Sequence, residues 1–279
     1  MPGLLPFLVV AALYAGLAVY FWRRTWLLGH ALGARPPLNA QRQALHRVIL
    51  FLPLAAHAWL LQATLASPAG FNFGFANAAS AIAWLALATY WLVNLRARMD
   101  GMLALVLPIA AVSVPLPALL PSSHYLSHAE LPLFRIHLAI SMLAYSLLSL
   151  AALHALLMAF VERRLHDKAV PPALNGMPPL LTLERLLFQV IGIGFALLTL
   201  TLLSGILFSE ELFGRPLQFT HKALFGSISW ATFATLLMGR HFYGWRGRTA
   251  IRWTLAGFVL LALAYFGSKF VLEILLGRA

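Results

Sequence analysis

The chain contains no cysteine and few charged side chains. Its 279 residues include 8 acidic residues against 20 lysines and arginines, and charged residues make up 10% of the total. The absence of cysteine excludes disulfides, cysteine-ligated metal centres, CxxC thiol exchange and covalent attachment of a prosthetic group through CxxCH within this chain. Acidic residues are so scarce inside the apolar runs that a carboxylate-based path for protons or cations has little support.

Apolar residues dominate what is present. They make up 61% of the chain, and the mean hydropathy of +0.84 is well above that of an ordinary soluble domain. A helix needs about 20 apolar residues to cross a bilayer. The charge-poor runs of about this length are Leu4–Trp22, Val48–Ala66, Phe75–Val93, Met102–Leu120, Ile136–Phe160, Leu187–Phe208, Ala223–Met238 and Leu255–Leu276. We therefore predict an all-α fold, a polytopic transmembrane bundle of eight helices in a single integral membrane domain over residues 1–279.

Two of these expected spans are irregular. Ala223–Met238 is short, and Met102–Leu120 contains Pro108, Pro115 and Pro117. Proline removes a backbone donor and kinks a helix unless neighbours compensate, so we expect a break or bend in this fourth span.

Lysine and arginine are distributed unevenly between the two expected membrane sides. One side holds fifteen of the twenty, and the remaining five are Arg135, Arg215, Lys222, Lys269 and Arg278. The positive-inside rule makes the richer side cytoplasmic and places both termini outside. The formal charge of +12 then has the anionic inner leaflet of the lipid bilayer as its counterpart, and no soluble basic module indicates a nucleic-acid partner.

Histidine is the polar residue that recurs at membrane depth. His57 lies in the middle of FLPLAAHAWLLQA, and His137 opens the expected helix at Ile136, near the outer surface. A neutral imidazole is the usual protein ligand of haem iron, so both are candidate axial ligands, although either side chain could instead be packed or hydrogen-bonded within the bundle. His154, deeper in the same helix as His137, is more typical of a packed histidine. Trp230 lies deep enough to line a flat apolar pocket.

Four segments carry a family resemblance. They are HLAISMLAY (137–145), MPPLLTLERLLFQVIGIGFALLTLTLLSG (177–205), KALFGSISW (222–230) and GRHFYGWRGRTAIRWTLAGF (239–258). In this order they resemble the CcsA-type (ResC-type) cytochrome c biogenesis family: the helix with its first outer-face haem histidine, the segment before its tryptophan-rich haem loop, the Lys and Trp after that loop, and its GWRGRR turn. The resemblance lies mainly within residues 134–270.

The sequence also departs from this family at the residues that handle haem. Where the family has a WGxYWxWD loop, residues 212–220 read LFGRPLQFT, and Met238 and Leu276 stand where further histidines are expected. These departures favour the eight-helix YpjD-type or HemX-like branch, which lacks the tryptophan-rich haem loop. They also argue against an enzyme, and no catalytic residue is expected.

The resemblance implies an integral protein of the bacterial inner membrane that binds or handles haem in cytochrome c assembly, with other assembly proteins or another membrane protein as partners. His57 and His137 are then the haem axial candidates, with Trp230, Arg240 and Arg246 as weaker cofactor-binding candidates; no other metal is expected. Positive-inside anchoring alone also explains the arginines. An accessory or regulatory scaffold subunit that binds no haem is the alternative. A small-molecule transporter is disfavoured, because few ionisable groups lie at the midplane.

Overall fold

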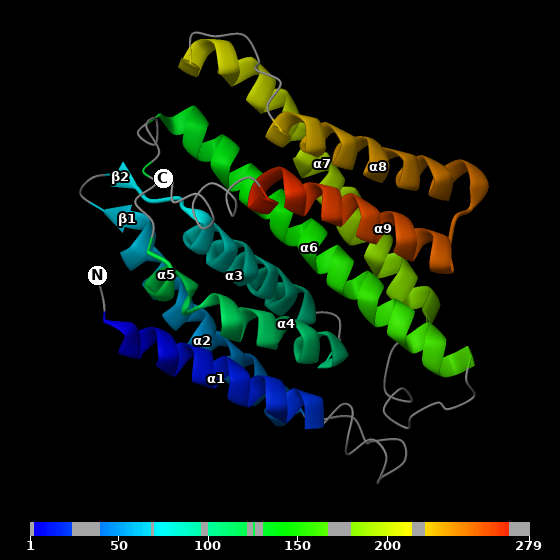
Figure 1. Cartoon of the computed structure of the whole chain (residues 1–279). Helices are drawn as coiled ribbons and strands as arrows, with labels where there is room; N and C mark the ends of the chain where they lie inside the picture. Colours follow the sequence, from blue (N-terminus) through cyan, green and yellow to red (C-terminus); the bar gives the residue numbers. More distant parts are fainter. Residues whose placement is uncertain are drawn as a thin grey trace.

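The computed structural model describes residues 3–23, 40–67, 70–95, 100–121, 125, 131–166, 180–213 and 221–267. The described chain is almost entirely helical, as Figure 1 shows. Its long helices are α1 (Leu4–Trp22), α2 (Ala40–Leu65), α3 (Phe75–Asn94), α4 (Asp100–Ser113), α6 (Pro132–His166), α7 (Leu180–Phe213), α8 (His221–Tyr243) and α9 (Gly247–Ala262). The predicted all-α bundle with eight long helices is confirmed.

Seven segments of the described chain are long and apolar enough to cross a membrane. Helix α8 is not among them: its 23 residues give it the length, but they include Lys222, Arg240, two histidines and four serines and threonines, which lower its hydropathy. Three of the four hydroxyls are bonded within the protein, because Thr232 and Thr235 donate to carbonyls one turn back and Ser229 donates to Gly257 O on α9 at 2.8 Å. Polar groups that are satisfied in this way are tolerated at membrane depth.

The fourth span is broken where the prolines predict a break. Helix α4 ends at Ser113, and the short helix α5 (Leu116–Leu119) begins after Pro115. Pro108 remains inside α4. The kink expected in this span is therefore confirmed and lies at Pro115.

The last span begins earlier than expected. Helix α9 starts at Gly247 rather than Leu255, and it continues into the π-helical turn η4 (Leu263–Gly267). The expected start was wrong because Arg248 and Arg252, which suggested a loop, are exposed side chains on the first turns of the helix. Long basic side chains can reach the membrane surface from such positions. The predicted end at Leu276 lies outside the described residues.

Helix α6 is the central element of the bundle. It packs against α3 and α4 on one side and against α7 and α9 on the other, whereas α1 and α2 complete the N-terminal half (Figure 1). The core includes Leu103, Leu148, Leu187 and Phe233, which have no exposed surface. Apolar side chains on the outer faces of the helices remain exposed, as expected for a bundle surrounded by lipid.

The two ends of the bundle differ in character. One end has a two-stranded antiparallel pairing that was not predicted, β1 (Ala66–Ser67) with β2 (Gly70–Phe71). The start of α1 and the last helical turn after α9 lie at this same end in Figure 1, as an even number of long helices requires. The other end has the basic residues of the α8–α9 turn. The assignment of the basic end to the cytoplasm stays a prediction.

Candidate functional site

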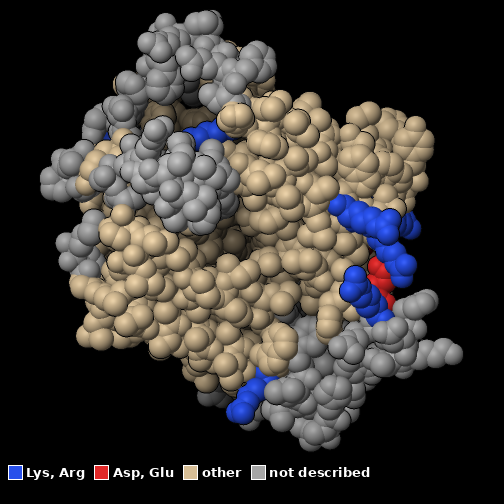
Figure 2. Space-filling view, in the orientation of Figure 1, with Lys and Arg blue, Asp and Glu red and all other residues tan. Residues whose placement is uncertain are grey.

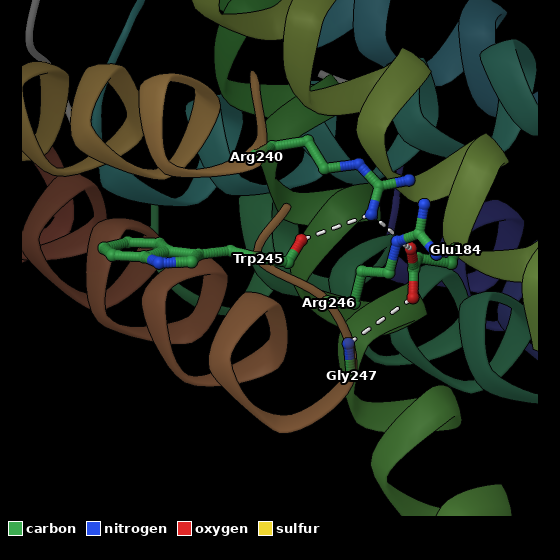
Figure 3. Close-up of polar contacts among 5 residues, drawn as sticks. All are labelled: Glu184, Arg240, Trp245, Arg246 and Gly247. Atoms are coloured by element: carbon green, nitrogen blue, oxygen red, sulfur yellow. Dashed lines mark hydrogen bonds and ion pairs between the residues drawn. The ribbon is translucent and has the colours of Figure 1, made fainter. Parts of the chain in front are cut away.

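A buried carboxylate at the basic end holds two of the predicted site residues. Glu184 lies in the second turn of α7, with its side chain 9% exposed. Arg240 Nη1 donates to Glu184 Oε1 at 2.6 Å, Arg246 Nε lies 3.7 Å from the same oxygen, and the Gly247 backbone N–H donates to Oε2 at 3.4 Å. Figure 3 shows both guanidinium groups directed at the carboxylate, while the Trp245 ring points away from it. We call Glu184, Arg240, Trp245, Arg246 and Gly247 together the Glu184 cluster.

The turn between α8 and α9 places the second arginine. Gly244 and Gly247 have φ of 64° and 52°, the left-handed region that glycine adopts without strain. The backbone reverses between them, and the Trp245 N–H donates to Gly239 O at 3.1 Å. The Trp245 ring folds back onto Gly239, where any Cβ would collide with it. The two glycines and the indole thus direct Arg246 and the Gly247 N–H towards α7.

The Arg240 guanidinium makes three contacts within the protein. Besides Glu184, its Nη1 reaches Trp245 O at 3.2 Å, and its carbon lies 4.6 Å from the centroid of the Phe188 ring, within the range of a cation–π contact. A second ion pair joins Arg248 Nε to Glu162 Oε1 of α6 at 2.8 Å. In Figure 2, basic side chains gather around an acidic patch at the right edge, over the ends of α6 and α9, and most of the remaining surface is neutral. These contacts tie the ends of four helices together.

Trp230 joins α8 to the middle of α7. Its indole N–H donates to Thr199 Oγ1 at 2.9 Å, and its ring stacks on Phe195 with centroids 5.6 Å apart. The side chain is half-buried. Its apolar face is therefore already covered in part by a protein ring, and the indole N–H is satisfied.

His137 lies in the second turn of α6 and contacts the other end of α7. Its Nδ1 lies 2.7 Å from Ser204 Oγ, and its ring packs next to Gly205. Ser204 Oγ also donates to Leu200 O at 2.7 Å. Because the hydroxyl has one hydrogen, Ser204 accepts a hydrogen bond from Nδ1–H. We assign this tautomer from the network; it leaves the lone pair on Nε2.

His57 is buried among α1, α2 and α3, with 1% of its surface exposed. Its Nε2 lies 2.9 Å from Ser80 Oγ, and its Nδ1 lies 3.5 Å from the Tyr14 hydroxyl, which donates to Pro53 O. Both ring nitrogens therefore have a neighbour within the bundle. Iron ligation through Nε2 would require the Ser80 hydrogen bond to break.

The five predicted site residues do not form a single pocket. Four of them contact α7, at Glu184, Thr199 and Ser204, whereas the contacts of His57 go to α1 and α3. The twenty residues from Glu184 to Ser204 span about 30 Å at 1.5 Å per residue, which is the thickness of the hydrocarbon core. One haem ligated by His137 therefore cannot also contact the Glu184 cluster.

The remaining positions singled out in the sequence have no contact that indicates a ligand, or they lie outside the described residues. His154 is 3% exposed, and its Nε2 has no hydrogen-bond partner among the described residues. Met238 is 58% exposed on α8, whereas the loop from Gly214 to Thr220 and Leu276 lie outside the described residues. Within the described ranges no three His, Asp or Glu side chains group as a metal site.

Sequence reasoning missed the partners of the predicted residues. Glu184 stands inside the quoted segment MPPLLTLERLLF, but an acid near the start of a helix is favourable on its own account. Its partner Arg240 is 56 residues away. Ser204 and Ser80 carry no signal in the sequence, because serine in an apolar run most often bonds to its own helix.

Comparisons with known proteins agree with this architecture. A family model described as Cytochrome C assembly protein matches residues 45–276. The inner membrane protein YpjD of Escherichia coli K12 is 33% identical over 228 residues, which cover 80% of this chain and 85% of that protein.

Two further relatives match shorter parts. An uncharacterized 28.8 kDa protein of Azospirillum brasilense is 36% identical over 144 residues, 51% of this chain and 52% of its own length. The cytochrome c biogenesis protein CcsA of Microcystis aeruginosa is 34% identical over 86 residues, 31% of this chain and 26% of that protein. The chain therefore belongs to the cytochrome c assembly protein family and is similar to YpjD over 80% of its length.

Proposed function

We propose that this protein binds or handles haem during cytochrome c assembly, as a multi-pass protein of the bacterial inner membrane with no catalytic activity of its own. Membership of the cytochrome c assembly protein family supports a role in that process, and the relative YpjD is an inner membrane protein. CcsA, a cytochrome c biogenesis protein, is similar over a shorter stretch.

The arrangement around His137 is the observation that carries the proposal. An iron-ligating histidine commonly donates its second ring N–H to a protein acceptor, which fixes the tautomer and orients the ring. Ser204 supplies this acceptor at 2.7 Å from Nδ1, and it does so from a different helix. The half-buried position near the start of α6 also suits a ligand that enters from the membrane surface.

The residues present therefore fit a haem ligated through one histidine. Haem would supply a redox-active iron in a flat apolar ring with two carboxylates. His137 would bind the iron, and Ser204 would hold the imidazole in position. The exposed apolar side chains Leu200, Leu203 and Ile136 lie on the same two helices and would keep the ring out of water. His57, enclosed by Ser80 and Tyr14, is the weaker of the two axial candidates.

Haemin titration of the detergent-purified protein tests the proposal. The wild type should give a Soret band, and His137→Ala should lower the bound haem several-fold or shift the band. Ser204→Ala should weaken binding about 10-fold, because the outer partner of a ligand histidine has an effect of this size. His137→Gly with added imidazole should recover the band, since free imidazole can replace the missing ligand.

His154→Ala is the matched control, because it removes an imidazole from the same helix and should leave the spectrum unchanged. Identical spectra for the wild type, His137→Ala, His57→Ala and the double variant would disprove the assignment. A changed spectrum in His57→Ala alone would instead assign the haem site to His57, in the N-terminal half of the bundle.

A scaffold subunit that binds no haem is the second candidate function. Helix α7 carries exposed apolar side chains along much of its length, at Ile193, Leu200, Leu203, Ile206 and Leu207. Such a face can pack against a helix of another membrane protein. A colourless preparation that also fails to bind added haemin would favour this function over the first.

A further inference from the structure

A groove lies between α6 and α9 on the basic side of the bundle, apart from both His137 and the Glu184 cluster. It has a volume of about 550 Å³. Its walls are Leu156, Ala159, Phe160, Glu162, Arg163, Arg248, Ile251, Arg252 and Leu255. None of these lining residues is a histidine, cysteine, methionine or tyrosine, so the groove offers no axial ligand for haem iron.

The lining of the groove is charged at one end and apolar at the other. Arg163 lies seven residues after Leu156 on α6, and Leu255 lies seven residues after Arg248 on α9. Seven residues are two helical turns on one face, or about 10 Å. The Arg248–Glu162 ion pair places the end of α6 beside the start of α9, so the helices run in opposite directions. The charged residues therefore meet at the membrane surface, and the leucines lie together about 10 Å deeper.

The charged end of the groove has an excess of arginine. Arg248 is paired with Glu162 at 2.8 Å, whereas Arg163 and Arg252 are exposed and have no hydrogen-bond or ion-pair partner among the described residues. Three arginines and one glutamate leave a net charge of +2 at this end. Guanidinium groups bind phosphate oxygens with well-matched geometry.

From this geometry we propose that the α6–α9 groove is a binding site for one anionic glycerophospholipid of the inner leaflet. Its phosphate lies between Arg163 and Arg252, and an acyl chain follows Leu156, Phe160 and Leu255 towards the membrane centre. The unpaired positive charge selects an anionic headgroup over a zwitterionic one, because a choline group would add a third positive charge.

Native mass spectrometry of the detergent-purified protein tests this site. Phosphatidylglycerol and phosphatidylcholine with the same acyl chains are titrated separately, and the first bound copy is counted. The wild type should bind phosphatidylglycerol about 10-fold more tightly than phosphatidylcholine. The Arg163→Gln/Arg252→Gln double variant should reduce this preference below about 2-fold. Each basic residue near the membrane surface contributes about 1 kcal/mol to the binding of an anionic lipid, and a factor of ten corresponds to about 1.4 kcal/mol.

The matched control is Arg23→Gln/Arg185→Gln. It removes the same two charges from exposed positions of the described chain that do not line the groove. This control should keep the preference. Equal losses in the two double variants would overturn the proposal, because they would show a diffuse surface charge, and so would an unchanged preference in Arg163→Gln/Arg252→Gln.

Glycerol 3-phosphate separates a lipid site from a plain phosphate site. It carries a phosphate with at least the negative charge of the lipid headgroup but no acyl chain, so it should not displace bound phosphatidylglycerol at equal concentration. Displacement would overturn the acyl-chain part of the proposal. Loss of the lipid on addition of haemin, with the same dependence on Arg163 and Arg252, would assign the groove to haem instead.

Discussion

At the scale of single residues, the environment of Glu184 restricts which side chains can replace it. Its carboxylate is 9% exposed, accepts hydrogen bonds from Arg240 and the Gly247 backbone N–H, and forms an ion pair with Arg246 at 3.7 Å. A charge so far removed from water is tolerated only when it is paired, and removal of one partner leaves the other uncompensated. Arg240 remains 28% exposed, so water recovers part of that loss.

Glu184→Gln should therefore lower the stability of the detergent-solubilised protein by about 1–3 kcal/mol. The measurement is the thermal midpoint followed by tryptophan fluorescence. Glu162→Gln is the control, because it breaks an ion pair whose side chains are 32% and 64% exposed, and it should cost less than about 1 kcal/mol. Equal shifts for the two variants would show that burial of Glu184 does not matter.

At the scale of elements, the end of α8 depends on a glycine that the next turn packs against. The Trp245 ring occupies the space in which a Cβ at Gly239 would lie, and the same ring contacts Trp253 at 5.4 Å between centroids. The indole cannot move away without disturbing α9.

Gly239→Ala should thus cost about 1–3 kcal/mol, as overpacking usually does. Gly192→Ala in α7 makes the same chemical change where nothing lies within 4 Å of the added carbon, and it should be neutral or raise stability by up to about 1 kcal/mol. Thermal midpoints of both variants give the comparison. A tolerated Gly239→Ala would mean that the turn repacks.

Sequence patterns predicted the elements better than the contacts between them. Hydropathy located the long helices, because seven of them are apolar enough to cross a bilayer and α8 contains the shorter apolar run Ala223–Met238. The prolines located the break after α4. The start of α9 was misplaced because arginines at a helix end resemble those of a loop. The approach of Ser204 to His137, across 67 residues, depends on packing that no local pattern encodes.

At the scale of the whole molecule, the basic end of the bundle fixes an orientation that can be measured. Reporter fusions after Arg164 and Arg248 should show cytoplasmic activity, and fusions after Ser67 and Arg278 should show activity outside. The structure places the start of α9 and strand β1 at opposite ends of the bundle (Figure 1). Outside activity at Arg248 would contradict the eight-helix count, whereas reversed activity at all four positions would invert the protein in the membrane.

The Glu184 cluster also bears on how the chain is made. Translation delivers Glu162 and Glu184 to the membrane well before Arg240, Arg246 and Arg248. During that interval Glu184, which the finished bundle buries, lacks the two arginines that pair with it. Arrival of the final hairpin neutralises it. A chain whose synthesis stops before residue 240 therefore keeps this carboxylate without its two arginines, and the cluster forms only after α8 and the α8–α9 turn have been made.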